Sequence, residues 1–285
     1  MQHRQLLCVA SLLLTLVFIQ TPVPSGAQSS RLKISSLTIS SPDQLKDEFA
    51  SVPCEDKDRL AAVKSLFERE GVPPAEIEID KYPKAENLVV VKKGESAEKI
   101  VLGAHYDKVK NGCGAVDNWT GVVALVHLYR TLKNVPTRKT LVFIGFGNEE
   151  AGLVGSRAMT KGFSKEQAAE YCAMINIDSL GLTSPQVADN MSTRKLGEFV
   201  GQVANEMGIP FSHASVKRAD SDSSAFVAKN IPAVTIHGMS SEFRKVLHTP
   251  EDQPSKVNPT SVYLGYKLAL EMVMRLDEST CDAYR

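Results

Sequence analysis

The chain has 285 residues, of which 43% are hydrophobic, and it carries 33 basic and 33 acidic residues. This length and composition are ordinary for a globular protein and suit one large α/β domain. Because the charges balance, nothing attracts the chain to nucleic acid or to a charged membrane surface, and we expect neither as a partner.

Residues 1–27 predict a cleaved signal peptide. Arg4 provides a basic start, residues 6–19 form an uncharged apolar run, and Ser25-Gly26-Ala27 are small residues suited to cleavage. An uncleaved membrane anchor is the alternative, although the apolar run is short for a bilayer span. We expect a secreted or periplasmic protein, free of the membrane after cleavage, with a flexible segment at residues 28–40 and one domain at residues 41–285.

Four cysteines of the expected exported chain would enter an oxidising compartment. They allow three pairings, and spacing alone does not choose among them. We favour a bridge between Cys54 and Cys281, because it would tie the N-terminal helical region to the C-terminal tail. A zinc site made of thiolates is not expected, since the chain has no CxxC pair. The other two cysteines are Cys113 and Cys172.

The first part of the domain is expected to contain helices and then strands. Ser41-Pro42-Asp43 has the chemistry of a helix N-cap, and residues 55–70 place apolar side chains on one helical face. Residues 71–74 contain Gly and two prolines, which end that helix. Strand-like runs follow at residues 76–80, 87–92 and 99–104, and Gly94-Glu95-Ser96 suits a hairpin loop between the last two.

Apolar strands and amphipathic helices alternate through the rest of the chain. Two strands, at residues 140–146 and 173–177, each end in carboxylates, and a third strand spans residues 231–237. The helical segments are residues 122–132, 159–170, 192–208 and 260–276.

Seven side chains with catalytic potential come from strand ends or from the loops after them. Taken singly, each has an ordinary explanation, such as a helix cap for Asp117 or a solvated helix start for the two adjacent glutamates. Taken together they lie where α/β sheets bind ligands, and two histidines with three carboxylates suit two zinc ions. The set is His105, Asp107, Asp117, Glu149, Glu150, Asp178 and His248.

The segments that carry these residues resemble the M28 family of di-zinc aminopeptidases. The resemblance runs, in family order, through Gly103-Ala104-His105-Tyr106-Asp107, Ala115-Val116-Asp117-Asn118-x-x-Gly121, Asn148-Glu149-Glu150-x-Gly152, Ile177-Asp178-x-x-Gly181 and His248-Thr249-Pro250-x-Asp252. It implies a single domain with a mixed, largely parallel twisted β-sheet sandwiched between α-helices. It also implies a cis peptide after Asp117.

The resemblance assigns a role to each side chain. His105 and Asp178 would bind one zinc ion, Glu150 and His248 the other, and Asp117 would bridge the two. Glu149 would be the general base for the dizinc-bound water and then the acid for the leaving amine. Asp107 would fix the tautomer of His105. The expected substrates are the N-termini of peptides or small proteins.

Two departures from the family pattern concern the substrate side of the site. Leu247 stands where many relatives have a tyrosine that helps the oxyanion, so another donor must serve. The loop Arg218-Ala219-Asp220-Ser221-Asp222-Ser223 differs from the usual Ser-Asp-His, and a solvated loop is favoured over contact of Asp220 or Asp222 with the substrate amine. Trp119, Phe226 and Met239 are candidates for a specificity pocket, with simple packing as the alternative.

Two other functions stay open. Glutaminyl-peptide cyclases share the His-Tyr-Asp start and the Glu-Glu pair but use one zinc ion; Asp117-Asn118-Trp119-Thr120-Gly121 favours hydrolysis over cyclisation. A non-catalytic ectodomain would usually lose ligands, and here none is missing. Asn118 lies in a glycosylation sequon but is discounted because of the site, whereas Asn190 remains a candidate. The sequence says nothing of the oligomeric state.

Overall fold

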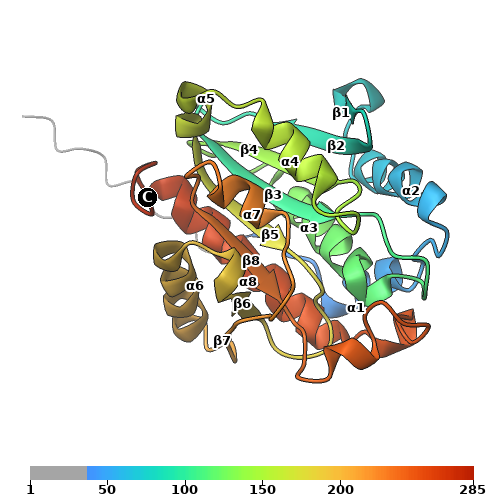
Figure 1. Cartoon of the computed structure of the whole chain (residues 1–285). Helices are drawn as coiled ribbons and strands as arrows, with labels where there is room; N and C mark the ends of the chain where they lie inside the picture. Colours follow the sequence, from blue (N-terminus) through green and yellow to red (C-terminus); the bar gives the residue numbers. More distant parts are fainter. Residues whose placement is uncertain (1–36) are drawn as a thin grey trace, which may run out of the picture. The chain divides into compact units, whose positions relative to one another are not determined.

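An eight-stranded sheet forms the centre of the computed structural model, which describes residues 37–285 (Figure 1). Its strand order is β1-β2-β4-β3-β5-β8-β6-β7. The four central strands β4, β3, β5 and β8 run parallel, while β1, β2 and β6 pair with their inner neighbours in antiparallel fashion. The bounds are β1 (Ile77–Tyr82), β2 (Ala85–Lys92), β3 (Lys99–His105), β4 (Thr140–Phe146), β5 (Tyr171–Ile177), β6 (Gln186–Ala188), β7 (Ser212–Ala214) and β8 (Ala233–His237).

Helices cover both faces of this sheet (Figure 1), which confirms the predicted α/β fold with a mixed sheet between helices. The larger layer contains α1, α2, α3, α6 and α8, and the smaller one contains α4, α5 and α7. The bounds are α1 (Pro42–Phe49), α2 (Asp56–Arg69), α3 (Thr120–Leu132), α4 (Val154–Lys161), α5 (Lys165–Glu170), α6 (Arg194–Glu206), α7 (Ser223–Val227) and α8 (Pro259–Glu278).

The central strands are buried on both faces, and this explains why they read as continuous apolar runs. In β3, Ile100 and Leu102 pack into the larger core, whereas Val101 between them packs into the smaller one. Phe143 and Ile144 of β4 divide between the two cores in the same way. Parallel strands with helices on both sides have this composition because neither face meets water.

The start of the described region is packed against the domain. The Ser41 hydroxyl accepts from the Gln44 N–H and the Gln44 side chain accepts from the Ser41 N–H, so the predicted cap of α1 is confirmed. Ser40 is buried, and its Oγ lies 2.6 Å from Nδ1 of His127. Ser40, the last residue of the segment expected to be flexible, is therefore packed against the domain. The expected signal peptide lies outside the described residues.

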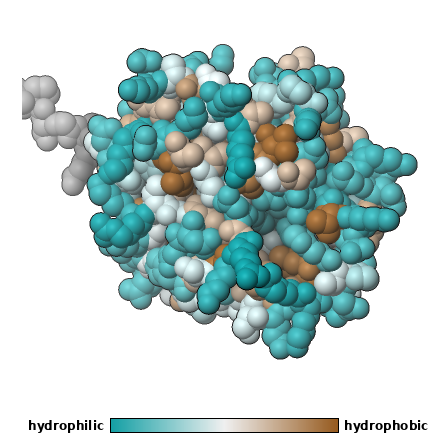
Figure 2. Space-filling model, viewed as in Figure 1, coloured by the Kyte–Doolittle hydropathy of each residue, from teal (hydrophilic) through white to brown (hydrophobic). Residues whose placement is uncertain are grey.

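Among the described residues, the face drawn in Figure 2 has no broad apolar area. Figure 2 shows a face covered mostly by hydrophilic residues, with small and separate hydrophobic patches. Val91 is the only large hydrophobic side chain classed as exposed within residues 37–285. No helix in the same range is both long enough and apolar enough to cross a bilayer.

The expected hairpin between residues 87–92 and 99–104 is wrong. β2 pairs with β1 and β4, and β3 pairs with β4 and β5, so the two strands are not neighbours. A Cβ on Gly94 would lie 2.2 Å from the Lys139 carbonyl oxygen. The glycine is required by this close approach of two backbone segments rather than by a tight turn.

The helix expected at residues 159–170 is two helices. α4 ends at Lys161 and α5 begins at Lys165, after Gly162 and a capping box formed by Ser164 and Gln167. A cap inside a polar segment is a local signal for a new helix start, and it outweighs the uniform polarity of the segment.

The favoured bridge between Cys54 and Cys281 is also wrong. The disulfides are Cys54–Cys113 and Cys172–Cys281. Cys113 lies in the loop after the carboxyl end of β3, whereas Cys172 lies at the amino end of β5, which runs parallel to β3. Cys54 and Cys281 therefore belong to opposite ends of the sheet, too far apart to be joined.

Candidate metal centre

The carboxyl ends of three adjacent parallel strands bring four of the predicted side chains to one edge of the sheet. His105 is the last residue of β3, Asp178 follows β5 directly, and Glu149 and Glu150 follow β4 after a short turn. In parallel strands these ends share one edge, which is where such sheets bind ligands.

Asp117 and His248 reach the same place from loops. Asp117 lies in the irregular turn η3 (Ala115–Trp119) that opens α3, and His248 lies between β8 and α8. Asp117 is buried, while the side chain of His248 is 57% exposed. The structure therefore brings together all five side chains expected to bind metal.

The five side chains form two groups that share Asp117. Nε2 of His105 lies 3.2 Å from Oδ1 of Asp117 and 3.5 Å from Oδ1 of Asp178. Nε2 of His248 lies 3.1 Å from Oδ2 of Asp117 and 3.1 Å from Oε2 of Glu150. Asp117 thus directs one oxygen to each histidine.

These separations fit zinc. Ligand atoms about 2.0–2.1 Å from a tetrahedral ion stand about 3.3 Å from one another, which is the spacing seen in both groups. Hydrogen bonds alone satisfy the arrangement poorly, because each Nε2 carries at most one proton and faces two carboxylate oxygens. Oε1 of Glu150 is in addition buried, and it has no hydrogen-bond partner among the described residues.

The electrostatics of the second group favour a cation at the same point. The hydrogen-bonded carboxylates of Asp117 and Glu150 raise the pKa of His248 to about 10. A carboxylate pair that holds a proton this firmly on an imidazole would also stabilise a metal ion placed between the three side chains.

Asp107 supports the turn that carries the two glutamates. Its Oδ1 accepts from the N–H of Glu149 at 2.9 Å and its Oδ2 accepts from the N–H of Glu150 at 3.1 Å. The same carboxylate lies 3.7 Å from Nδ1 of His105, whereas the main-chain oxygen of Asp107 lies 3.2 Å from that nitrogen. The carboxylate therefore holds Glu149 and Glu150 in place, and the carbonyl is the nearer partner of His105.

Asp252 supports Asp117 in a similar way. Its carboxylate is buried and accepts from the N–H groups of Val116 at 2.7 Å and Asp117 at 3.2 Å. Asp252 stands four residues after His248, so one loop supplies both a candidate ligand and the support of the bridging carboxylate.

The expected cis peptide joins Asp117 to Asn118, and the side chain of Asn118 fixes the turn around it. Its Oδ1 accepts from the N–H of Gly121 and of Ser179, each at 3.0 Å, and its Nδ2 donates to the carbonyl of Ile177. A Cβ on Gly121 would lie 2.4 Å from Oδ1 of Asn118. These contacts explain the Asn-x-x-Gly spacing and leave Asn118 buried, which excludes its use as a glycosylation site in the folded chain.

Asp178 is oriented by two hydroxyl groups. Ser221 Oγ donates to Oδ2 of Asp178 at 2.5 Å, and Ser179 Oγ donates to Oδ1 at 3.0 Å. Asp222, for which a solvated position was expected, is instead fully buried, and within residues 37–285 neither of its carboxylate oxygens has a hydrogen-bond partner. Burial raises the pKa of Asp222 to about 7.

Glu149 lines the cleft beside the two groups, in a strongly acidic setting. Burial, and then the charges of Asp222, Asp178 and Asp117, raise the pKa of Glu149 well above its usual range, against the opposing effect of His105. A carboxyl group with a raised pKa can hold a proton near neutral pH and pass it on.

Arg59 is a supporting residue that sequence reasoning missed. Its guanidinium is fully buried and donates to the carbonyls of Tyr106, Pro53, Cys113 and Gly114. It therefore ties α2 to the loop between His105 and Asp117, and the bridge Cys54–Cys113 ties the same two segments. The sequence did contain a sign that Arg59 is buried, because it stands on the same face of the expected helix as Val63 and Leu66.

A cavity of about 590 Å³ opens onto the two groups. Part of its wall is apolar and includes Met191, Val216, Met239, Phe243 and Leu247. Of the three residues considered for a specificity pocket, only Met239 lines this cavity. The other two, Trp119 and Phe226, are packed in the cores.

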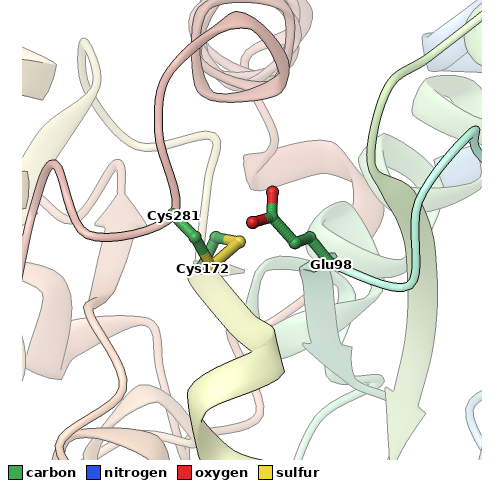
Figure 3. A group of neighbouring side chains, drawn as sticks. All are labelled: Glu98, Cys172 and Cys281. Carbon is green, nitrogen blue, oxygen red and sulfur yellow. A yellow bond between two sulfur atoms is a disulfide. The ribbon is translucent and has the colours of Figure 1, made fainter.

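One further group of potential ligands is not a metal site. Figure 3 shows the Glu98 carboxylate beside Cys172 and Cys281, whose sulfur atoms are joined in a disulfide. Zinc binds cysteine as a free thiolate, and neither sulfur is one here.

Comparison with known proteins places the chain among metallopeptidases. The family model described as peptidase family M28 matches residues 87–273. Aminopeptidase YwaD of Bacillus subtilis is 28% identical over 187 residues, which are 59% of this chain and 39% of YwaD. The solved structure of BSAP, a zinc aminopeptidase from Bacillus subtilis, aligns with a TM-score of 0.61 and 24% identity over 70% of this chain and 52% of that one.

The same fold occurs in a protein with a different activity. A solved Acidobacteriales bacterium glutaminyl cyclase aligns with a TM-score of 0.69 and 18% identity, over 83% of this chain and 94% of that one. The fold alone therefore does not separate hydrolysis from cyclisation.

Proposed function

The chain belongs to peptidase family M28, and from this premise we propose that it is a zinc-dependent aminopeptidase that removes the N-terminal residue of peptides. The relatives named above support the activity, although the chain spans only 39% of YwaD and 52% of BSAP. The observation that carries the proposal is the position of Asp117 between two histidines, with one oxygen facing each.

We propose two zinc ions per chain. His105 and Asp178 would hold one ion, Glu150 and His248 the other, and Asp117 would bind both. When bound, the ions would polarise the scissile carbonyl and make the attacking water more acidic.

Glu149 is proposed as the residue that moves protons. It lines the cleft, and its neighbour Glu150 rather than Glu149 faces His248. Glu149 would accept a proton from the attacking water and deliver it to the leaving nitrogen. Asp107 would position Glu149 through the hydrogen bond to its main-chain N–H.

A one-zinc glutaminyl cyclase is the alternative that the shared fold keeps open. Two features favour hydrolysis. His105 faces two carboxylate oxygens, as a second metal site requires, and the segment Asp117-Asn118-x-x-Gly121, whose sequence favours hydrolysis, forms a turn held by the side chain of Asn118. A non-catalytic ectodomain is less favoured, because all five candidate ligands and Glu149 are present and converge.

We further propose that the protein is exported. Two disulfides join the described residues, and such bridges persist in oxidising compartments. The signal peptide proposed at residues 1–27 would provide the route.

The activity is tested with leucine p-nitroanilide, since part of the cavity wall beside the site is apolar. We expect hydrolysis that a chelator abolishes and added zinc restores. Cyclisation of a glutamine-initial peptide without release of leucine would establish the alternative instead. A protein loaded with zinc that performs neither reaction would contradict both enzymatic assignments.

A further inference from the structure

The cavity is lined by charges of both signs. Besides the carboxylates of the proposed metal centre and the apolar wall, its lining includes three arginines from separate elements and the carboxylate of Asp220. The cluster of carboxylates at the centre suits a metal ion or a free amine, and an arginine with no partner suits an anion. The arginines are Arg157 of α4, Arg218 of the loop between β7 and α7, and Arg244 of the short turn η5 (Phe243–Lys245).

Arg218 is the arginine that no internal role explains. Its side chain is exposed, it lines the cavity, and its guanidinium has no hydrogen bond or ion pair within residues 37–285. Its backbone adopts a φ of 60°, in the left-handed region that few residues other than glycine and asparagine favour. A side chain presented to a cavity at such a cost in backbone conformation is a candidate for ligand binding.

The loop that presents Arg218 is held from both sides. Arg157 pairs with Asp220 at 3.3 Å, and Arg244 donates to the carbonyl of Lys217 at 2.8 Å. The side-chain oxygen of Asn190 accepts from the N–H of Val216 at 2.8 Å, and its Nδ2 donates to the carbonyls of Val216 and Ala219, each at 3.3 Å. These contacts fix the residues on either side of Arg218 and leave its own guanidinium free.

We propose that Arg218, with Arg157 and Arg244 beside it, binds a carboxylate of the substrate. Resting on the proposed aminopeptidase function, this inference makes the preferred substrates short peptides that carry a negative charge beyond the cleaved bond. The amine would lie beside the carboxylates of the centre, and the carboxylate of the substrate beside Arg218. The carboxylate could be the free C-terminus of the peptide or the side chain of an aspartate or glutamate.

Matched peptides distinguish these two sources. Leu-Gly, Leu-Gly-Gly and Leu-Gly-Gly-Gly are compared as free acids and as C-terminal amides, and Leu-Glu-amide is compared with Leu-Gln-amide. We expect kcat/KM of the acid to exceed that of the amide about tenfold at one peptide length. If the side chain is the source, Leu-Glu-amide exceeds Leu-Gln-amide instead.

The arginine is tested by Arg218→Asn, because asparagine tolerates the left-handed backbone. The variant should lose the preference for the carboxylate and retain hydrolysis of leucine p-nitroanilide, which carries none. The control is Arg194→Asn, which removes an exposed arginine of α6 that does not itself line the cavity. This control should change neither the preference for the carboxylate nor the hydrolysis of leucine p-nitroanilide.

Binding of the same peptides to zinc-loaded Glu149→Gln is measured by calorimetry, so that the inference can be judged without turnover. Tighter binding of acids that is lost on adding Arg218→Asn supports it even if leucine p-nitroanilide proves not to be a substrate. Equal binding and equal kcat/KM for acids and amides would overturn it while leaving the aminopeptidase assignment intact.

Discussion

Replacing Arg59 by methionine tests whether α2 is part of the framework of the site. The guanidinium donates hydrogen bonds to four carbonyls, three of which belong to the loop that leads from His105 to Asp117. Each buried carbonyl that loses its hydrogen bond costs about 1–3 kcal/mol. Removing Arg59 also removes the cost of burying its charge, which lowers the pKa of Arg59 to about 10, and this offsets part of the loss in stability. We therefore expect a loss of about 3–5 kcal/mol in the free energy of unfolding, similar to breaking a buried ionic group.

The chain offers a direct probe for this variant. Trp119 is the only tryptophan, it is buried, and the Arg59 guanidinium lies 5.0 Å from the centre of its ring. Denaturant unfolding followed by Trp119 fluorescence should show the loss as a lower midpoint, with a fall in Tm of about 10 °C. Hydrogen exchange of the amides between residues 106 and 117 should accelerate in the metal-free protein.

Arg69 is the matched control on the same helix. It is 59% exposed and pairs with Glu48 at 3.2 Å, so Arg69→Met should cost less than about 1 kcal/mol. If Arg59→Met were as stable as this control, with unchanged exchange in the loop, the framework role of Arg59 would be refuted.

Three other predictions concern the centre and its support. Glu149→Gln should retain its zinc and lose about 10²–10⁴ in kcat, and an unchanged kcat would remove Glu149 from its proposed role. His248→Ala should hold about one zinc ion fewer per chain by atomic absorption, and a full complement would contradict its assignment as a ligand. Replacing Cys54 and Cys113 by serine opens a loop of 59 residues and should cost about 4 kcal/mol in denaturant unfolding, whereas a change below about 1 kcal/mol would count against the bridge as a stabilising link.

The convergence of the candidate ligands could be predicted because each lies directly at a strand end or in a short motif. His105, Glu150 and Asp178 follow apolar runs whose strand character is plain in the sequence, and parallel strands necessarily bring such ends together. A local signal also found the cap of α1, whereas the cis peptide at Asp117 was expected only from the family resemblance.

Features that depend on which segments become neighbours could not be predicted. The run at residues 87–92 is a strand as expected, yet nothing in its pattern says that it pairs with β4 rather than β3. The disulfide pairing could not be predicted for the same reason, since spacing does not reveal that Cys113 and Cys172 lie at opposite ends of the sheet. β6 and β7 were missed because three-residue strands carry too little periodicity to recognise.

The polar residues that support the site could be predicted only in part. Asp252 was part of a recognised motif, but its hydrogen bonds to the backbone of Asp117 depend on the folded loop. Arg218 and Arg244 are ordinary surface arginines in sequence, and only the cavity gives them a shared context.

The central claim is that Asp117 joins two metal ions, and the most direct measurement is anomalous diffraction at the zinc edge from crystals of the zinc-loaded protein. We expect two peaks, one among His105, Asp117 and Asp178 and the other among Asp117, Glu150 and His248. A single peak in the second group, with His105 unligated, would contradict the two-metal account.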